Sequence, residues 1–248
     1  MKKIYILWLR QIKRYLRSHS RILGSLGQPV LLLFALGYGL GSVFKEAGMG
    51  NYLSFIAPGI ISMSVVFTSI SSGMEVIWDR QFGFLRQILV APVSRLNILL
   101  GRTLGSATIA TFQGCLIMVI ATMLGFRPSS WWAFMFIIPC MLLLSVMFSS
   151  LAAAVASILN DMQGFQLILQ FLIMPMFFLS GALYPLEGLP IILEFIVSIN
   201  PLTYGVDAFR HILIGVGYYN FLTDLTVLAV LSGILLIVGD RLFGRMQV

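Results

Sequence analysis

The residues that most often carry metal or redox chemistry are few in this chain, and they lie apart. The two cysteines, Cys115 and Cys140, sit in long apolar runs. The two histidines, His19 and His211, have no cysteine or second histidine near them in the sequence. Metal-ligand spacings such as C-x-x-C and H-E-x-x-H are missing from the sequence. We therefore expect two buried free thiols and no metal site.

The sequence also predicts no nucleotide site and no enzymatic centre. The glycine-rich run from Gly37 to Gly41 looks like part of a nucleotide fingerprint, but it lies in an uncharged apolar stretch. We interpret Gly37 and Gly41, like Gly101 and Gly105, as small residues at which helices approach each other closely. A G-x-x-x-x-G-K-[ST] loop requires a Gly-Lys pair, which the sequence lacks. No paired carboxylates or nucleophile–base pair indicates catalysis.

None of the long apolar runs has a charged residue in its middle, where a residue that relays ions across a membrane would lie. Glu75 lies at the end of one run, and Asp161 lies between two others. An ion-coupled transporter usually carries an acid or a histidine at mid-depth. An autonomous secondary transporter or channel, not coupled to ATP, would need Glu75 or Asp161 in this role. It is the alternative to a transporter that receives its energy from another subunit.

The composition of the chain is very apolar, and it indicates what kind of fold must position these residues. Of the 248 residues, 59% are hydrophobic and 10% are charged, with a mean hydropathy of +0.98, whereas a soluble domain carries about 25% charged residues. A soluble fold of this length has too little interior to bury so many apolar side chains. We therefore expect an all-α polytopic membrane protein in which residues 1–248 form one domain.

Six apolar runs are long enough to cross a bilayer, which requires about 20 helical residues. The predicted transmembrane helices cover residues 22–44, 52–74, 103–126, 131–159, 162–186 and 221–242. A further apolar stretch, 188–206, contains Glu194 and is broken by Pro190 and Pro201. We expect it to belong to an external re-entrant hairpin over 185–210, between spans five and six, which the other helices shield from lipid.

The basic residues indicate the orientation of these spans. Three of them, Lys45, Arg127 and Arg210, fall on one side of the six-span topology. The other thirteen fall on the opposite side: Lys2, Lys3, Arg10, Lys13, Arg14, Arg17, Arg21, Arg80, Arg86, Arg95, Arg102, Arg241 and Arg245. Both termini are therefore predicted to be cytoplasmic. The same bias, with the anionic headgroups of membrane lipid, explains the net charge of +7 without nucleic-acid binding.

Residues 1–21 precede the first span, and their pattern predicts an amphipathic helix in the membrane interface. Ile4, Leu7 and Trp8 share an apolar face, while Arg10 and Arg14 lie on a basic face. Arg10 also interrupts the apolar run, and no small-residue cleavage site follows, so we expect this end to be retained. The helix either only anchors the orientation or also borders a cytoplasmic partner.

The predicted cytoplasmic loop from Glu75 to Arg102 is long for a connection in a compact protein. It mixes charges with apolar residues such as Phe82 and Leu85, and Pro92 favours the end of a short helix. Exposed apolar residues on a loop usually indicate a docking surface. The alternative is a helix that merely lies on the membrane.

The predicted external segment, residues 184–220, starts with Tyr184-Pro185 and continues with Asn200-Pro201, a dipeptide that favours the start of a turn. Asp207 and Arg210 are three residues apart, a spacing that predicts a pair on one helical face. The simplest role for this segment is a structural cap that holds span six.

Two stretches of the chain carry a family pattern. The first contains Asp79-Arg80, Gly83, Leu89 and Ala91-Pro92-Val93-Ser94-Arg95, and leads to Leu100-Gly101-Arg102. The second contains Gly181-Ala182-Leu183-Tyr184-Pro185, then Asn200-Pro201-Leu202-Thr203-Tyr204, Asp207 and Arg210. Together with the six spans, they resemble the permease subunits of type 2 ATP-binding-cassette (ABC) exporters. That group includes antibiotic-resistance, nodulation-factor and polysaccharide export permeases.

The resemblance implies partners and roles for individual residues. It implies a homodimer, or a heterodimer with a related permease, carrying two ABC ATP-binding subunits that bind ATP and Mg, so we expect no cofactor in this chain. Residues 78–94 are implied to be a coupling helix seated in a cleft of the ATPase. The residues expected to couple to the ATPase are Arg80, Gly83, Leu85, Arg86, Leu89 and Pro92.

The resemblance also implies roles for the two remaining segments. On the interfacial helix, which carries Trp8, Arg10 and Arg14, we expect Trp8 and Arg10 to make lateral contacts. The hairpin is implied to dip into the outer half of the membrane near the exit. Its candidate residues are Tyr184, Pro185, Asn200, Pro201, Tyr204, Asp207 and Arg210.

The expected function is ATP-driven export across the plasma membrane by a permease without an ATPase site of its own. ATP binding would close the two ATPases, tilt the docked loops and rock the spans, with cargo passing between the protomers. Because the spans offer few polar groups, an amphipathic or lipid-like cargo is favoured, such as a drug, a lipid or a lipid-linked glycan. Besides the ATP-independent transporter, a membrane-embedded enzyme or scaffold is a further alternative.

Overall fold

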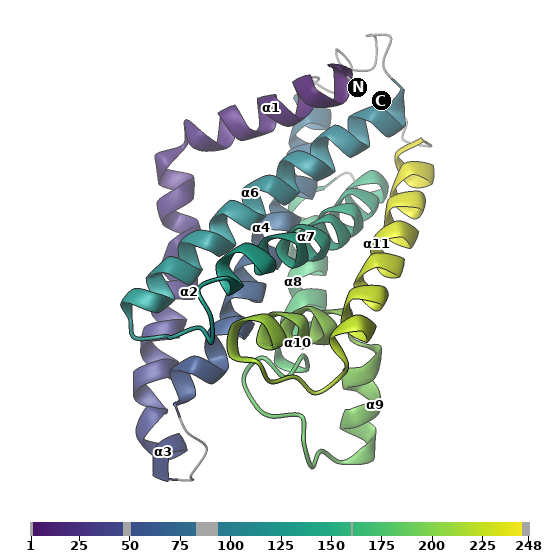
Figure 1. Cartoon of the computed structure of the whole chain (residues 1–248). Helices are drawn as coiled ribbons and strands as arrows, with labels where there is room; N and C mark the ends of the chain where they lie inside the picture. The colour runs from purple at the N-terminus through teal and green to yellow at the C-terminus, as the bar shows by residue number, and fades with distance from the viewer. Residues whose placement is uncertain (1, 47–50, 83–93, 160, 245–248) are drawn as a thin grey trace.

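The computed structural model describes residues 2–46, 51–82, 94–159 and 161–244. Every regular element within these ranges is an α-helix. The helices, shown in Figure 1, are α1 (Lys2–Leu16), α2 (His19–Gly39), α3 (Gly41–Glu46), α4 (Tyr52–Gln81), α6 (Arg95–Met123), α7 (Ala133–Ile158), α8 (Met162–Phe178), α9 (Ile191–Ile199), α10 (Pro201–Ile214) and α11 (Phe221–Gly244). The prediction of an all-α fold is confirmed.

Five helices, α2, α4, α6, α7 and α11, are long and apolar enough to cross a membrane. They coincide with five of the six predicted spans, and the chain is an all-α polytopic membrane protein. The pair α9 and α10 passes the same test only when the two are taken together, and they are bent by 85° at the break between them. This bend fits either a broken span or a re-entrant loop, so the membrane position of the predicted hairpin stays a prediction.

The helix at the predicted fifth span, α8, is shorter than the apolar run that contains it. It ends at Phe178 after 17 residues, which is about 25 Å of helix at 1.5 Å per residue. Pro175 lies in its last turn, and Gly181 has a φ of 72°, which is outside the helical region. A crossing at this place therefore needs the non-helical residues that follow α8, and these must be shielded by protein.

Two helices extend beyond their predicted spans at the same end of the bundle. Helix α4 continues to Gln81 instead of ending at residue 74, and α6 begins at Arg95 instead of residue 103. The Ser94 hydroxyl accepts a hydrogen bond from the Asn97 N–H and so caps the start of α6. The predicted loop between Glu75 and Arg102 is thus helical at both of its ends.

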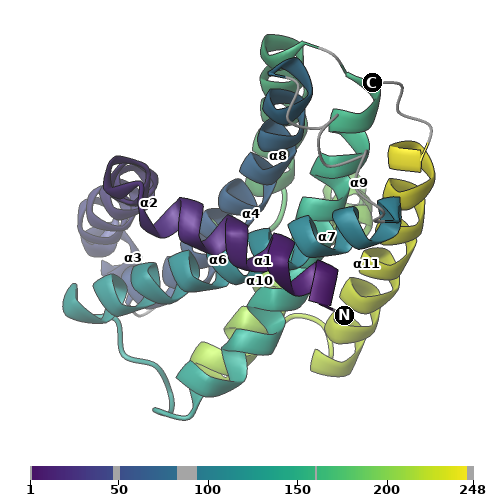
Figure 2. The same ribbon diagram turned by 90° about the horizontal axis from the view of Figure 1, so that it is seen from above.

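Helix α4 is the centre of the bundle and contacts α2, α6, α7, α8 and α10. Figure 2 shows these helices arranged around it. A glycine brings α7 and α8 close to it, since a Cβ on Gly73 would lie 2.5 Å from Phe165 Cζ and 2.7 Å from the Ala152 carbonyl oxygen. Much of α4 is therefore buried in protein rather than exposed to lipid.

The glycines in the first predicted span do not form one packing face. A Cβ on Gly37 would lie 2.6 Å from Leu53 Cδ1, so α2 approaches α4 closely there. Helix α2 then ends at Gly39, and nothing lies within 4 Å of a Cβ built on Gly41, the first residue of α3. The interpretation of these glycines as sites of close helix approach is therefore right for Gly37 and wrong for Gly41, because α2 ends between them.

Helix α1 lies along α6, as Figures 1 and 2 show. Gly101 and Gly105 permit this contact, because a Cβ on either would lie 2.7 Å from the Cβ of Leu7 or Gln11 respectively. At the far end of α1, the buried Tyr15 hydroxyl donates to Gln113 Oε1 at 2.5 Å, and burial raises the pKa of this phenol. The face that the sequence assigns to the membrane interface therefore contacts α6, and contact of α1 with lipid stays a prediction.

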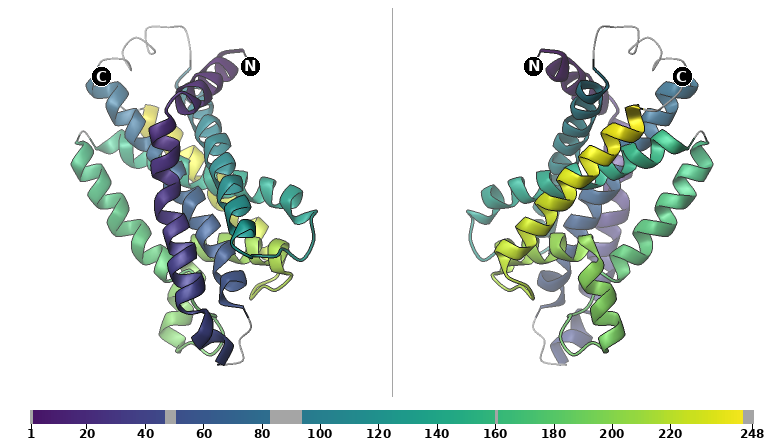
Figure 3. Two further views of the ribbon diagram at one scale, coloured as in Figure 1. Left: turned by 90° about the vertical axis from the view of Figure 1, so that its left-hand side faces the viewer. Right: turned by 90° about the vertical axis from the view of Figure 1, so that its right-hand side faces the viewer.

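The start of the first helix and the end of the last one lie at the same end of the bundle. Figure 3 shows the start of α1 and the end of α11 at this end. Arg95 Nη1 donates to the Gly244 carbonyl oxygen at 2.5 Å, which joins the start of α6 to the end of α11. We name this the inner end; its location in the cytoplasm stays a prediction.

Gly101→Ala is expected to weaken the packing of α1 on α6. The added Cβ would lie 2.7 Å from Leu7 Cβ and 3.2 Å from the Ile4 carbonyl oxygen, so α1 must move away at a cost of about 1–3 kcal/mol. We expect a lower midpoint of thermal unfolding for the detergent-purified protein. Gly233→Ala is the matched control, because nothing lies within 4 Å of its Cβ. Equal midpoints for the two variants would contradict the close packing.

Candidate functional site

A network of ion pairs joins four helices at the inner end. Glu75 on α4 accepts a hydrogen bond from Arg21 Nη1 on α2 at 2.5 Å and lies 4.0 Å from Arg14 Nη1 on α1. One turn further along α4, Asp79 pairs with Arg102 Nη2 on α6 and lies 3.9 Å from Arg14 Nη1. Arg14 therefore lies between the two carboxylates. We call these five residues the inner network.

Burial makes the inner network expensive to disturb. The side chains of Glu75 and Asp79 are each 8% exposed, and that of Arg102 is 6% exposed. A buried charge that loses its partner destabilises a protein by about 3–5 kcal/mol. The network therefore fixes α1 and α2 against α4 and α6. The sequence did not reveal it, because the partners are separated by 54 and 23 residues and meet only through helix packing.

Glu75 and Asp161, the residues that an ATP-independent transporter would need as relays, both have structural partners. Glu75 belongs to the inner network near the end of α4. Asp161 caps the start of α8 and accepts hydrogen bonds from the N–H groups of Gln163 and Gly164. Both carboxylates therefore hold helix ends in place.

The three candidate residues of the interfacial helix point in different directions. Trp8 Nε1 donates to Thr108 Oγ1 on α6 at 3.0 Å, so the indole serves the packing of α1. Arg14 is partly exposed but belongs to the inner network, and Arg10 is exposed. A lateral contact of Trp8 and Arg10 with a partner stays a prediction.

The predicted coupling segment, residues 78–94, lies mostly outside the described residues. The candidates that lie outside are Gly83, Leu85, Arg86, Leu89 and Pro92. Arg80 belongs to the last turn of α4. Beside it, Trp78 is 42% exposed and Phe82 is 72% exposed. Two aromatic side chains are therefore accessible at the inner end, where the segment starts.

A polar-lined groove runs along one face of α4, between α2 and α8. It consists of two hollows of about 140 Å³ and about 300 Å³, and Phe67 and Ser71 line both. The first lies against α1 and α2, and the second against α8. The polar side chains that line the groove are Arg21, Ser25, Gln28, Ser64, Thr68, Ser71, Gln166 and Gln170.

The glutamines are the unusual feature of this groove. Gln28 on α2 and the pair Gln166 and Gln170 on α8 are exposed. Gln166 and Gln170 are four residues apart, so they lie on the same face of α8. Polar side chains within membrane helices usually face other protein or a water-filled cavity rather than lipid. We therefore expect this face of the chain to contact protein or water rather than lipid.

The predicted turn at Asn200-Pro201 is present, and Asn200 holds it in place. Its side chain accepts a hydrogen bond from the Leu202 N–H at the start of α10, and its Nδ2 donates to the Met176 carbonyl oxygen on α8 at 2.6 Å. The hydroxyl of Tyr204 donates to the Ser198 carbonyl oxygen on α9 at 2.7 Å. These bonds fix the bend between α9 and α10 against the end of α8.

Asp207 and Arg210 do not pair as their spacing predicts. Arg210 Nη2 donates to the Gly181 carbonyl oxygen at 2.6 Å, and the guanidinium lies 4.1 Å from the centre of the Phe55 ring. Asp207 accepts hydrogen bonds from the N–H groups of Tyr218 and Tyr219. Both side chains are buried and satisfy backbone groups of other segments. Tyr184 and Pro185 lie in the connection between α8 and α9 that contains Gly181.

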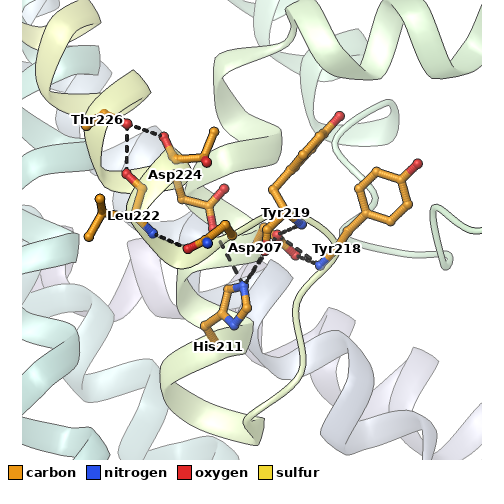
Figure 4. Close-up of polar contacts among 9 residues, drawn as sticks. Asp207, His211, Tyr218, Tyr219, Leu222, Asp224 and Thr226 are labelled. Carbon is orange, nitrogen blue, oxygen red and sulfur yellow. Dashed lines mark hydrogen bonds and ion pairs between the residues drawn. The ribbon is translucent and has the colours of Figure 1, made fainter.

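Three side chains, Asp207, His211 and Asp224, lie close together where α10 joins α11 (Figure 4). The sequence did not indicate that they would be neighbours. His211 Nε2 lies 3.9 Å from Asp207 Oδ2 and 4.0 Å from Asp224 Oδ2. The same nitrogen is 2.7 Å from the Tyr219 carbonyl oxygen. Burial, together with nearby tyrosines and carboxylates, raises the pKa of the Tyr219 phenol to about 12, so this hydroxyl is neutral. We call Asp207, His211 and Asp224 the outer cluster.

The chain has clear relatives among known proteins. It matches the family model described as ABC-2 type transporter over residues 2–214. Nodulation protein J of Rhizobium meliloti (strain 1021) is 31% identical over 198 residues, which is 79% of this chain and 75% of that protein. Nodulation protein J of Rhizobium leguminosarum bv. viciae is 28% identical over 228 residues, which is 91% of this chain and 87% of that protein.

Asp79→Asn is expected to destabilise the protein by about 3–5 kcal/mol, because it leaves the buried Arg102 without its carboxylate partner. The midpoint of thermal unfolding of the purified protein measures this loss. Glu46→Gln is the matched control, since Glu46 is exposed. Adding Arg102→Met to Asp79→Asn removes the stranded charge and should recover part of the lost stability. A wild-type midpoint for Asp79→Asn would show that the buried pair does not hold α4 to α6.

Proposed function

Because the chain belongs to the ABC-2 type transporter family, we propose that it is the permease subunit of an ATP-driven exporter. Family membership implies an ABC ATPase partner, and the proposal adds that ATP hydrolysis by this partner drives export from the cytoplasm. The observation that carries the proposal is the groove on α4, where hydroxyl and amide side chains lie among apolar ones within the apolar part of the bundle.

The ATPase is proposed to dock at the inner end, on residues 78–94. Trp78 and Phe82 support this placement, because exposed aromatic side chains usually mark a contact surface. Trp78 lies directly before Asp79 of the inner network, and Phe82 lies directly after the end of α4. A tilt of the docked segment would therefore pass through α4 to α1, α2 and α6. Two ATPase copies per permease dimer, with ATP and Mg bound by the ATPase, complete the proposed assembly.

The second permease protomer is proposed to cover the groove. Gln28, Gln166 and Gln170 are exposed on the walls of the groove, and an amide group in lipid lacks hydrogen-bond partners. A second copy, or a related permease, facing the groove would enclose a path lined by amides and hydroxyls. Cargo would then pass between the two protomers along α4.

An amphipathic or lipid-like cargo suits this groove best. Its lining alternates apolar side chains, such as Phe67, Phe165 and Ile173, with hydroxyl and amide groups. Arg21, at the end of the first hollow, is the charged residue among the lining side chains. Such a lining binds apolar groups and neutral polar groups together, as in a drug, a lipid or a lipid-linked glycan.

The alternative, a secondary transporter or channel that works without ATP, has less support. It requires a carboxylate that takes up and releases ions in the membrane interior. Glu75 is ion-paired with Arg21, and Asp161 caps α8. Both residues would have to break a structural contact in every transport cycle.

The proposed location is the plasma membrane, with both termini in the cytoplasm. Arg14, Arg21, Arg95 and Arg102 lie on or near the inner end together with the start of α1 and the end of α11. Basic residues collect on the cytoplasmic side of membrane proteins. The inner end is therefore proposed to be the cytoplasmic one, which places α9 and α10 in the outer half.

Charge reversal at Arg80 and Arg86 is expected to uncouple the permease from its ATPase. Wild-type protein purified in mild detergent from its native membrane should carry an ABC ATPase at one copy per permease, as measured by quantitative mass spectrometry. In inverted vesicles, ATP should drive uptake of an amphipathic fluorescent dye. Arg80→Glu with Arg86→Glu should lower this uptake about tenfold or more, as expected for the loss of two charge-assisted contacts.

Arg127→Glu is the matched control for this charge reversal. Arg127 is exposed and lies in the connection between α6 and α7, at the end of these helices that is opposite to the inner end. This control should leave ATP-driven uptake unchanged. Unchanged uptake in the double variant would contradict the proposal that the ATPase docks on residues 78–94. Purification of the wild type without any ATPase, together with dye uptake that needs no ATP, would favour the secondary transporter.

The double substitution Gln166→Leu and Gln170→Leu is expected to impair transport without releasing the ATPase. Both side chains lie in the groove, and the loss of their hydrogen bonds should lower dye uptake about tenfold. ATPase co-purification should stay at the wild-type level, since neither glutamine belongs to the proposed docking segment, residues 78–94. Leu167→Ala on the same helix is the control, because Leu167 is 70% exposed and lies outside the groove. Equal uptake in both variants would place the cargo path elsewhere.

A further inference from the structure

The outer cluster is unusual because one of its carboxylates is buried without a partner. Asp224 is 0% exposed, and neither of its oxygens accepts a hydrogen bond within the described part of the chain. A buried carboxylate without hydrogen bonds or a cation destabilises a fold strongly. Asp224 Oδ2 is directed at His211 Nε2, 4.0 Å away. This distance is too long for a hydrogen bond, so the His211 ring does not satisfy the Asp224 carboxylate.

From this geometry we propose that Asp207, His211 and Asp224 bind a divalent transition-metal ion of the kind represented by Zn²⁺. Each residue offers one ligand atom, and these atoms all lie within 4.8 Å of one another. Two ligands on a tetrahedral Zn²⁺ are about 3.4 Å apart for bond lengths near 2.1 Å. The separations are 3.9 and 4.0 Å from His211 Nε2 and up to 4.8 Å across the set. Metal binding therefore requires the side chains to rotate until these distances close by about 0.5 to 1.4 Å.

The donor chemistry suits this class of ion. Imidazole nitrogen and carboxylate oxygen are both ligands of Zn²⁺ and related metals. His211 Nε2 lies 2.7 Å from the Tyr219 carbonyl oxygen. Without a metal, that nitrogen carries a proton and donates it to the carbonyl. A metal ion displaces the proton, takes the nitrogen lone pair and neutralises the two carboxylates.

The surroundings of the outer cluster hold its ligands in position. Asp207 accepts N–H bonds from Tyr218 and Tyr219, and bonds of this kind orient a ligating carboxylate. The connection between α10 and α11 lies against the imidazole, since a Cβ on Gly217 would come within 2.0 Å of His211 Nε2. Only glycine fits there without displacing the ring. His211 is 25% exposed at its side chain, so an ion has an entry route that Asp224 alone lacks.

Metal binding would cross-link two helices, α10 and α11. Asp207 and His211 belong to α10, the second half of the bent pair, and Asp224 belongs to the first turn of α11. An ion bound to all three joins the proposed external hairpin to the last span. This inference rests on the three side chains and their partners and does not depend on the cargo or on coupling to an ATPase.

Zinc binding to the full-length chain tests the site directly. The protein is purified with a tag that contains no histidine, treated with a chelator, incubated with ZnCl₂ and desalted. Mass spectrometry of the metal content should then give one Zn²⁺ per chain, and Zn²⁺ should raise the midpoint of thermal unfolding. Asp224→Asn and His211→Gln should each weaken Zn²⁺ binding by at least about tenfold, and Zn²⁺ should no longer raise their midpoints.

Two control variants separate this site from non-specific binding. Glu187→Gln removes an exposed acid from the same outer region, and His19→Gln removes the other, exposed histidine; both should bind Zn²⁺ like the wild type. Because Asp224→Asn risks misfolding, His211→Gln is the second test at a partly exposed position. The proposal is wrong if the wild type retains no Zn²⁺ and shows no shift of its midpoint. It is equally wrong if His211→Gln binds Zn²⁺ as tightly as His19→Gln.

Discussion

Lipid offers no hydrogen-bond partner to a polar group, and this constraint decides where the polar side chains of the chain lie. Isolated serines donate to their own helix, as Ser69 does to the Val65 carbonyl oxygen and Ser150 to that of Val146. Buried charges such as Arg102 and Asp79 pair across neighbouring helices. The glutamines of the groove are exposed instead, which is why their face indicates contact with protein or water.

The two ends of the bundle satisfy their charges by different means. At the inner end, Glu75 and Asp79 face three arginines, so opposite charges lie together. At the other end, Asp207 relies on backbone N–H groups, and Asp224 accepts no hydrogen bond from the described residues and lies 4.0 Å from His211. The inner network is therefore complete within the chain, whereas the outer cluster lacks positive charge. This difference makes the outer cluster a place for an external ion and the inner network a mechanical link.

Features that depend on local sequence could be predicted, and features that depend on packing could not. Long apolar runs identify α2, α4, α6, α7 and α11, and the turn at Asn200-Pro201 follows from local turn chemistry. The ends of α4 and α6 could not be predicted from the apolar runs, because the helices continue past them into a stretch where Asp79 and Arg102 pair across the bundle. Arg210 likewise turns from Asp207 to the Gly181 carbonyl oxygen, a contact between distant residues. The groove and the outer cluster also combine residues from separate helices.

The two walls of the groove are held with different strength, and this bears on how an export cycle can proceed. Arg21 ties α2 to α4 through a charge-assisted bond with Glu75. Helix α8 buries one apolar stripe, and two side-chain hydrogen bonds between α8 and α4, from Trp78 to Met162 and from Gln166 to Met74, run to methionine sulfur, a weak acceptor. Moving α8 therefore breaks weaker interactions than moving α2. A groove that opens and closes during export should do so at α8, while the inner network keeps α2 and α4 together as one rigid unit.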